Sequence, residues 1–236
     1  MNLPPTALPK TVFLLREGFV THRGSDRAQT VMVGFYEQRI VPYIVDVALS
    51  GNEFARLRAR VASGLEGEVL EVGFGSGRNV PHYPPAVKRV QAVDPATVGR
   101  RLAAKRVAAS PIPVEYVGLD GQTLPIESET VDHVLTTWTL CTIPDVGRAL
   151  GEIRRVLRPG GALHFLEHGR SPDAKVSRWQ DRITPINRRI AGGCHPNRPI
   201  DSLLTEADLE VTRLENYYVR GPKALSYMFE GVARRR

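Results

Sequence analysis

The residues best suited to chemistry lie at positions 71–77, which read EVGFGSG. An apolar stretch leads into the acid Glu71, and three glycines then alternate with other residues. Glycines let the backbone approach a ligand closely, and a helix that follows offers unpaired N–H groups. A dinucleotide fingerprint, G-x-G-x-x-G, would need glycine at position 78 or 80, where Arg78 and Val80 stand. The stretch therefore indicates a different ligand, or an ordinary tight turn.

A second acid, Asp94, ends the next apolar stretch, residues 88–94. If both stretches are parallel strands, their carboxyl ends meet at one edge of the sheet. A carboxylate at that edge can accept both hydroxyls of a ribose, which predicts a ligand that contains a nucleoside. The alternative is that Asp94, which precedes Pro95, only forms a turn.

Alternating strands and helices are expected to position these acids. Strands are predicted at 69–72, 88–94, 114–117, 131–137 and 162–167, helices over 97–109, 146–157 and near 202–206, and a final strand pair at 209–216 and 224–232. Asp145 is expected to cap the second of these helices. The alternation predicts an α/β fold with a mostly parallel sheet and helices on both faces.

The chain divides into an N-terminal extension, residues 1–33, and a single domain, residues 34–236. Within the domain, residues 34–63 predict two helices that cap the pocket, and Pro42 requires a kink or a late start in the first. Residues 169–200 are rich in arginine and interrupted by prolines and glycines. They predict an irregular segment that covers the pocket.

Composition narrows the class of protein. With 236 residues, 42% hydrophobic and 24% charged, the chain suits a globular domain. Its net charge of +7 is scattered apart from residues 234–236, which favours a solvated tail over a nucleic-acid surface. Its two cysteines, Cys141 and Cys194, form no disulfide framework or paired zinc motif. This use of cysteine indicates a reducing compartment. A cytoplasmic location is expected, since no stretch reaches the length of a membrane span.

Three motifs carry a resemblance to the class I S-adenosylmethionine-dependent methyltransferases. They are the acid and glycines of 71–77, the stretch LDGQTLP at 119–125, and LRPGG at 157–161. The resemblance implies a Rossmann-like, seven-stranded, mostly parallel sheet with S-adenosylmethionine bound at its edge. It implies that Glu71 addresses the methionine ammonium, that Asp120 receives the adenine amino group, and that the N–H of Gly121 meets a ring nitrogen. The cofactor-binding set is Glu71, Gly73, Phe74, Gly75, Gly77, Asp94, Pro95, Asp120, Gly121, Thr137 and Trp138.

Several of these assignments have plain structural alternatives. Glu71 could instead cap the following helix. Asp120 could form a local turn through its own side chain. Trp138 either lies against the cofactor's sulfonium by cation–π attraction or is an ordinary core residue.

Within the family, the chain resembles the branch that acts on small molecules, which includes quinone-biosynthesis C-methyltransferases. The stretches at 70–85, 165–168 and 193–194 also resemble the methyltransferase-like thiol S-methyltransferases, which carry an apolar N-terminal anchor that this sequence does not show. Enzymes that methylate the amines of nucleobases have an Asn/Asp-Pro-Pro-aromatic motif after the fourth strand, whereas Thr139 to Thr142 read TLCT. No nucleic-acid partner is therefore expected. Peripheral membrane contact and oligomeric state stay open.

His168, at the end of the fifth strand, is the candidate catalytic base, or else a histidine that closes a loop. Phe35, Tyr36, Cys194 and His195 are candidates for the acceptor pocket, although glycines beside Cys194 would also explain that loop. No metal is expected, because no His/Asp cluster has ligand spacing. The sequence favours thiol S-methylation. The alternatives are C- or O-methylation of a quinol or phenol, or a cofactor-binding protein without catalysis.

Overall fold

The computed structural model describes residues 40–236. The predictions for the extension, for Phe35 and for Tyr36 lie outside these residues. In chain order the elements are α2 (Val41–Ala48), α3 (Asn52–Ala62), β1 (Gly67–Val72), the 3₁₀ turn η1 (Val80–His82), β2 (Val87–Val93), α4 (Thr97–Ala108), β3 (Val114–Gly118), β4 (Val131–Thr137), α5 (Val146–Val156), β5 (Leu157–His168), α6 (Ala174–Ile190), α7 (Ile200–Glu206), β6 (Leu209–Tyr218), α8 (Lys223–Ser226) and β7 (Tyr227–Arg235).

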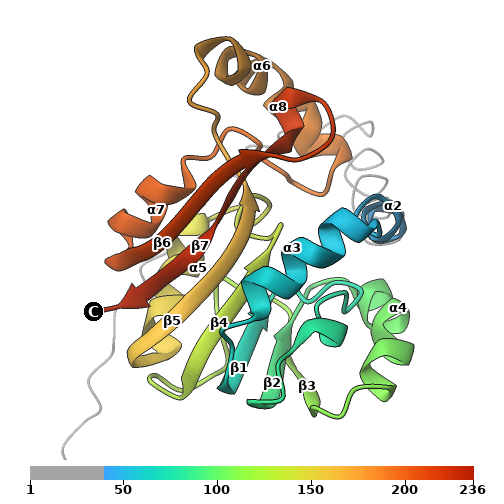
Figure 1. Cartoon of the computed structure of the whole chain (residues 1–236), viewed down its shortest axis with the longest axis vertical. Helices are drawn as coiled ribbons and strands as arrows, with labels where there is room; N and C mark the ends of the chain where they lie inside the picture. The colour runs from blue at the N-terminus through green and yellow to red at the C-terminus, as the bar shows by residue number, and fades with distance from the viewer. Residues whose placement is uncertain (1–39) are drawn as a thin grey trace, which may run out of the picture.

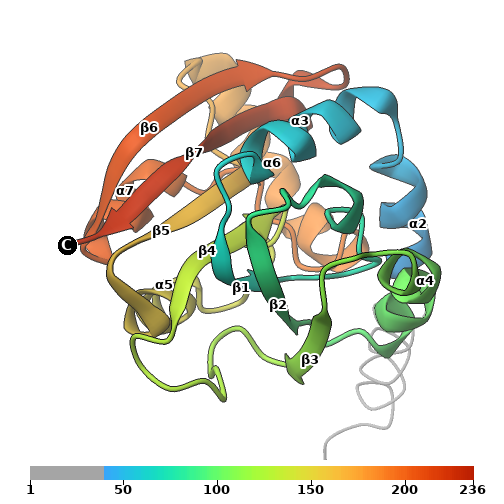
Figure 2. The ribbon, with the colours of Figure 1, turned by 60° about the horizontal axis from the view of Figure 1, so that its bottom comes forward.

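The seven strands form one sheet in the order β3-β2-β1-β4-β5-β7-β6, which can be followed across Figure 2. Strands β1 to β5 run parallel to one another, and β7 is antiparallel to both β5 and β6. The chain runs outward from β1 to β3 and then returns to β4. The order of strands therefore reverses between β1 and β4, where open α/β sheets bind their ligands. The fold predicted from the sequence is confirmed.

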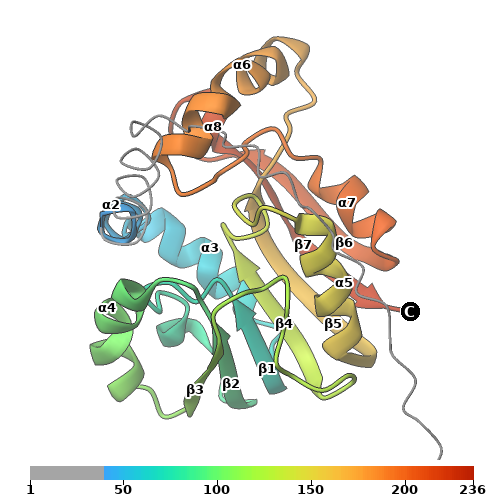
Figure 3. The same ribbon diagram turned by 180° about the vertical axis from the view of Figure 1, so that it is seen from behind.

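Each face of the sheet has its own core. On one face Leu150 and Ile153 of α5 and Leu204 of α7 are fully buried against the strands (Figure 3). On the other, Val61 of α3 and Ala103 of α4 are buried in a second cluster, with α3 crossing the sheet in Figure 1. The predicted cap of α5 is present, since the Asp145 side chain accepts the N–H of Arg148 at 3.0 Å. The helices packed on the two faces of the sheet hold the carboxyl ends of the strands in fixed positions relative to one another.

The sequence predicts that residues 169–200 are irregular, but in the structure the helix α6 occupies the centre of this segment. Asp173 caps the helix by accepting the N–H of Lys175 at 2.7 Å. Gln180 on its buried face donates to backbone carbonyls of both flanking loops, at 3.0 and 2.9 Å. Pro185 lies inside the helix and removes a backbone hydrogen bond without ending it. These tertiary contacts outweigh the local signal of the proline.

Two prolines determine where short helical segments begin near the cavity. The glycine stretch is followed only by η1, whose first turn contains Pro81, and not by a full helix. Helix α2 begins at Val41 with Pro42 in its first turn, which is the late start that the proline required. Among residues 40–236, no helix combines the length and apolar character needed to cross a membrane.

A pair of histidines on β4 and β5, half-buried His133 and buried His164, makes stability depend on pH. His164 Nδ1 lies 3.1 Å from the carbonyl of Val61, and its Nε2 lies 3.0 Å from His133 Nδ1. A carbonyl only accepts, so His164 donates from Nδ1 and accepts at Nε2 from His133. Burial, followed by the charge of His133, lowers the pKa of His164 to about 4.

Acidification is therefore expected to destabilise the protein through His164. Between a pKa of about 6.5 when unfolded and about 4 when folded, the unfolded chain binds the extra proton. The free energy of unfolding should thus fall as pH falls through this window, by about 3 kcal/mol in full. Urea unfolding at pH 7 and pH 5 should show a smaller loss in His164→Gln than in the parent chain. Equal losses in the two proteins would contradict this assignment.

Candidate active site

A cavity of about 690 Å³ lies at the carboxyl ends of β1, β2 and β4. This is within the range of roughly 300–1,000 Å³ typical of small-molecule sites. Of the residues named from the sequence, it is lined by Gly73, Phe74, Gly75, Asp94, Pro95, Asp120, Gly121, Thr137 and Trp138. Among the described residues, Glu71, Gly77, His168, Cys194 and His195 are not part of this lining. The cavity thus collects most of the predicted cofactor set.

The glycine turn has backbone angles that favour glycine at all three positions. Gly73, Gly75 and Gly77 have φ values of +80°, +54° and +70°. A Cβ on Gly73 would stand 1.9 Å from Thr139 Oγ1, so this glycine lets the turn after β4 pack against it. A Cβ on Gly75 would meet nothing closer than a carbonyl 3.9 Å away. Gly75 therefore presents bare backbone to the cavity.

Asp94 joins this turn to the end of β2. Its Oδ2 accepts the N–H of Gly75 at 2.7 Å, and its Oδ1 accepts the N–H of Ala96 at 2.7 Å. The side chain is buried, and this burial raises its pKa. Each carboxylate oxygen keeps acceptor capacity beyond these single bonds. Asp94 can therefore hold the turn and still receive hydroxyl groups from a ligand.

Asp120 occupies a different environment at the cavity rim. It is exposed, and its Oδ1 accepts from the side chain and the backbone of Gln122, which lower its pKa. The local turn considered as an alternative role is thus present. A Cβ on neighbouring Gly121 would stand 2.7 Å from Val72 Cγ1. This close approach brings the loop and its N–H groups against the end of β1.

Glu71 lies behind the cavity lining. Its carboxylate accepts from the amide of Asn79 at 2.9 Å and from the hydroxyl of Tyr83. Desolvation raises the pKa of this fully buried acid to about 7. η1 has no side-chain cap, so the helix-capping alternative does not apply. Glu71 instead orients Asn79, which does line the cavity.

Arg58 of α3 is a lining residue that the sequence reasoning missed. It donates to Asn79 Oδ1 at 2.9 Å and to Thr137 Oγ1 at 3.1 Å, and its guanidinium lies 4.6 Å from the Trp138 ring centre. Burial lowers its pKa to about 10, so it stays charged at neutral pH. Its Nε is buried without a partner among the described residues. A signal was present in the sequence, because this arginine lies three and four residues before the buried Val61 and Ala62.

Trp138 follows β4 in a conformation that is rare for a large side chain, with φ of +52°. Its ring contacts Phe54 edge-on at 5.6 Å and carries Arg58 on its face. Its indole N–H is buried without a partner among the described residues. Such backbone strain concentrates at functional sites. The structure therefore shows Trp138 as a packed residue that also forms part of the cavity wall, and its contact with a sulfonium stays a prediction.

Helix α2 is tied across the glycine turn by Asp46. Its carboxylate accepts from Ser76 at 2.5 Å and from Arg78 at 2.7 Å through two nitrogens. Burial opposes ionisation, but the hydrogen bonds from Arg78 and Ser76 lower the pKa of Asp46 overall. The helix thereby brings Val41, Val45 and Leu49 to the cavity as an apolar wall.

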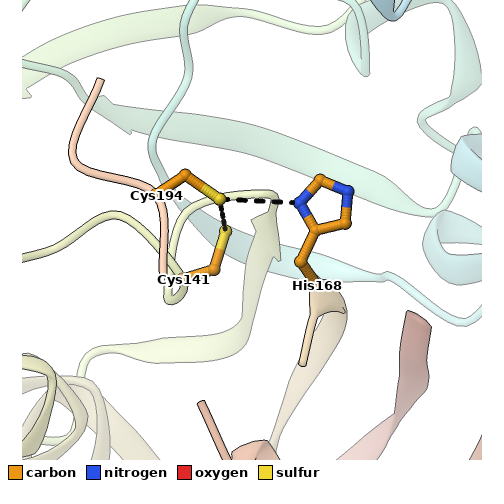
Figure 4. A group of neighbouring side chains, drawn as sticks. All are labelled: Cys141, His168 and Cys194. Atoms are coloured by element: carbon orange, nitrogen blue, oxygen red, sulfur yellow. Dashed lines mark hydrogen bonds between the residues drawn. The ribbon is translucent and has the colours of Figure 1, made fainter. Parts of the chain in front are cut away.

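Three side chains from distant parts of the chain meet beside the cavity (Figure 4). Cys194 Sγ lies 3.8 Å from Cys141 Sγ and 3.7 Å from His168 Nδ1. Both cysteines are free and buried. The hydrogen bond from Cys141, then His168, lowers the pKa of Cys194 to about 5, whereas the pKa of Cys141 is raised. No sequence motif indicates this cluster, because its members lie 27 and 26 positions apart and so have no ligand spacing.

A buried carboxylate fixes the loop that carries Cys141. Glu167, next to His168, accepts the N–H of Thr139 at 3.1 Å and the N–H of Cys141 at 3.3 Å. The backbone N–H of His195 donates to the Cys141 carbonyl at 2.7 Å. These bonds join the loops after β4 and α6 to the end of β5. His195 therefore holds this carbonyl through its backbone N–H, with its ring Nδ1 also 3.3 Å away, while Cys194 points to the cluster.

Comparison with known proteins agrees with this geometry. A methyltransferase-domain family model matches residues 70–165. The thiol S-methyltransferase TMT1B of Rattus norvegicus is 30% identical over 69% of this chain and 68% of its own length. The thiol S-methyltransferase TMT1A of Homo sapiens is 32% identical over 63% of this chain and 62% of its own. The aligned part thus spans about two thirds of each relative.

The fold also matches solved structures. A geranyl diphosphate methyltransferase in complex with S-adenosylmethionine superposes with a TM-score of 0.63 over 86% of this chain and 91% of its own, at 16% identity. The strand order, the glycine turn and the sequence relatives point to the same conclusion. The chain belongs to the class I S-adenosylmethionine-dependent methyltransferases.

Proposed function

We propose that this enzyme methylates the sulfur of a small, partly hydrophobic thiol. The observation that carries the proposal is the state of the carboxylates on the cavity. Asp46 is bound by Arg78 and Ser76, Asp94 by two backbone N–H groups, and Asp120 by Gln122. Asp46 is held by an ion pair, and we assign the remaining acceptor capacity of Asp94 and Asp120 to the cofactor, which leaves none of the three as a base for the acceptor. A thiol, whose pKa is about 8.5, needs less help to ionise than an alcohol or a carbon acid.

The apolar wall and the relatives support the same acceptor. Val41, Val45, Leu49 and Ile143 line the same cavity as Trp138. Such a wall suits an acceptor with a hydrophobic body. The relatives named above are thiol S-methyltransferases, and their identity of 30 and 32% supports this acceptor for the present chain.

The lining residues fit the cofactor. When bound, S-adenosylmethionine supplies a methyl group on a positively charged sulfur. We assign its ribose hydroxyls to Asp94 and its adenine edge to Asp120 and the N–H of Gly121. The unpartnered Nε of Arg58 suits the methionine carboxylate. Trp138 offers a π-face to the sulfonium. The remaining assigned residues, Gly73, Phe74, Gly75, Gly77, Pro95 and Thr137, shape the turn and walls, and Glu71 acts through Asn79.

The protein's contribution to the reaction is then positioning and exclusion of water. Asp94 and Arg58 would fix the two ends of the cofactor, and the wall of α2 would hold the acceptor in line with the methyl group. His168, named from the sequence as a base, does not itself line the cavity: its Nδ1 lies 3.7 Å from Cys194 Sγ, and its ring centre lies 6.4 Å from that of Trp138.

Matched acceptors test the proposal. The 2-phenylethyl thiol, alcohol and amine share one carbon skeleton and differ only in the reacting atom, and a hydroquinone adds the quinol alternative. With methyl-labelled cofactor we expect the thiol to react at least about 100-fold faster than the alcohol, the low end of what a general base contributes. Labelled product from the hydroquinone or amine, with none from the thiol, would refute the proposal.

A further inference from the structure

The cluster of Cys141, His168 and Cys194 has the geometry of a metal site. The three ligand atoms all lie within 4.8 Å of one another. They come from the loop after β4, the end of β5 and the loop after α6, and the side chains converge on one point in Figure 4. Residues beside them, Thr142 and Gly193, line the cavity.

Two of the three observed distances agree with tetrahedral coordination. With zinc–sulfur bonds of about 2.3 Å and zinc–nitrogen bonds of about 2.0–2.1 Å, tetrahedral angles place two sulfurs about 3.8 Å apart and a sulfur and a nitrogen about 3.5 Å apart. Cys194 Sγ lies 3.8 Å from Cys141 Sγ and 3.7 Å from His168 Nδ1. The third pair, Cys141 and His168, lies within 4.8 Å, so an ion would draw these two ligands toward each other.

The donor set selects the metal. Two thiolates and an imidazole suit zinc and not the hard cations magnesium and calcium, which prefer oxygen. Two thiolates also neutralise the charge of a divalent ion, which reduces the cost of burying it. Three protein ligands with a fourth position left free are typical of zinc sites that take part in chemistry. Among residues 40–236, the cluster consists of these three ligands, so the fourth position is left for a further ligand.

We propose that Cys141, His168 and Cys194 bind one zinc ion and that its fourth position takes the sulfur of the acceptor thiol. The second half of this proposal rests on the proposed function. As the thiol binds, its S–H bond breaks, a zinc–sulfur bond forms and the proton passes to water. The metal thus keeps the acceptor as a thiolate, which is the nucleophile that methyl transfer requires. This replaces both the expectation of a metal-free site and the role of His168 as a base.

Zinc binding is tested on the full chain without reference to activity. After incubation with zinc chloride and gel filtration, elemental analysis should find one zinc per chain. Cys194→Ser and His168→Ala should lose most of it, whereas His82→Ala, which removes a histidine outside the cluster, should keep it. X-ray absorption of the unmutated protein, which does not depend on how the variants fold, should show two sulfurs at about 2.3 Å and two light atoms at about 2.0–2.1 Å, the imidazole nitrogen and a water that the acceptor thiol later displaces.

Adding the thiol separates this proposal from the proposed function. With 2-phenylethanethiol the sulfur count around zinc should rise from two to three, and the matched alcohol should leave it unchanged. Thiol methylation by protein that binds no zinc would overturn the zinc site while leaving the function intact. If the protein binds zinc at this site but methylates no thiol, the zinc site stands and the proposed function is refuted. A Cys141–Cys194 disulfide in protein prepared anaerobically under reducing conditions would also overturn the zinc site.

Discussion

Gly75→Val is expected to abolish S-adenosylmethionine binding while the chain remains folded. The Cβ position at residue 75 is open on the cavity side, so the branched side chain would fill space that the cofactor needs. Loss of at least 100-fold in affinity corresponds to about 2.7 kcal/mol. Titration calorimetry measures the affinity, and urea unfolding checks that the variant is folded.

Gly160→Val is the matched control for backbone strain. Gly160 also has a positive φ, +77°, and its Cβ position has no heavy atom within 4 Å, but it lies in β5 outside the cavity lining. A residue with a Cβ in this conformation costs about 1–3 kcal/mol. Both variants should therefore lose similar stability, and only Gly75→Val should lose binding. Comparable loss of affinity in the two variants would show that strain, and not occupation of the cavity, is responsible.

Asp94→Ala is expected to weaken S-adenosylmethionine binding at least tenfold. The substitution would remove the proposed charge-assisted hydrogen bonds to the ribose, each worth about 1.5–3 kcal/mol, from a buried position. It also frees the N–H of Gly75 and loosens the turn. Asp120→Ala should have the smaller effect, because Asp120 is exposed and competes with water for its partners. Calorimetry on both variants measures which of them loses more affinity.

A cofactor product analogue separates the two effects of Asp94. S-Adenosylhomocysteine without its ribose hydroxyls should bind the parent chain and Asp94→Ala with more similar affinities than the complete compound does. If the ratio of affinities is the same for both compounds, Asp94 acts only through the turn. Affinity that is unchanged by Asp94→Ala would contradict the assignment altogether.

Much of the fold was predictable because it depends on local patterns. The alternation of apolar strands with helices, the cap at Asp145 and the turn at residues 73–77 each follow from residue type and spacing. The α6 region was not predictable in this way. Pro185 gives a strong local signal against a helix, and the contacts that outweigh it, from Gln180 to two flanking loops, join residues distant in sequence.

The sequence by itself determined where the proposed cofactor site lies, because the glycines of residues 73–77 follow the end of β1 and Asp94 follows the end of β2. Tertiary structure alone decided which side chains share that space. Glu71 lies behind Asn79, and Arg58 enters the cavity from a helix that precedes the sheet. Cys141, His168 and Cys194 come together because parallel strands align their carboxyl ends and α6 returns the chain to that edge. Such convergence depends on how entire strands and helices pack together, and the spacing of residues along the chain does not predict that packing.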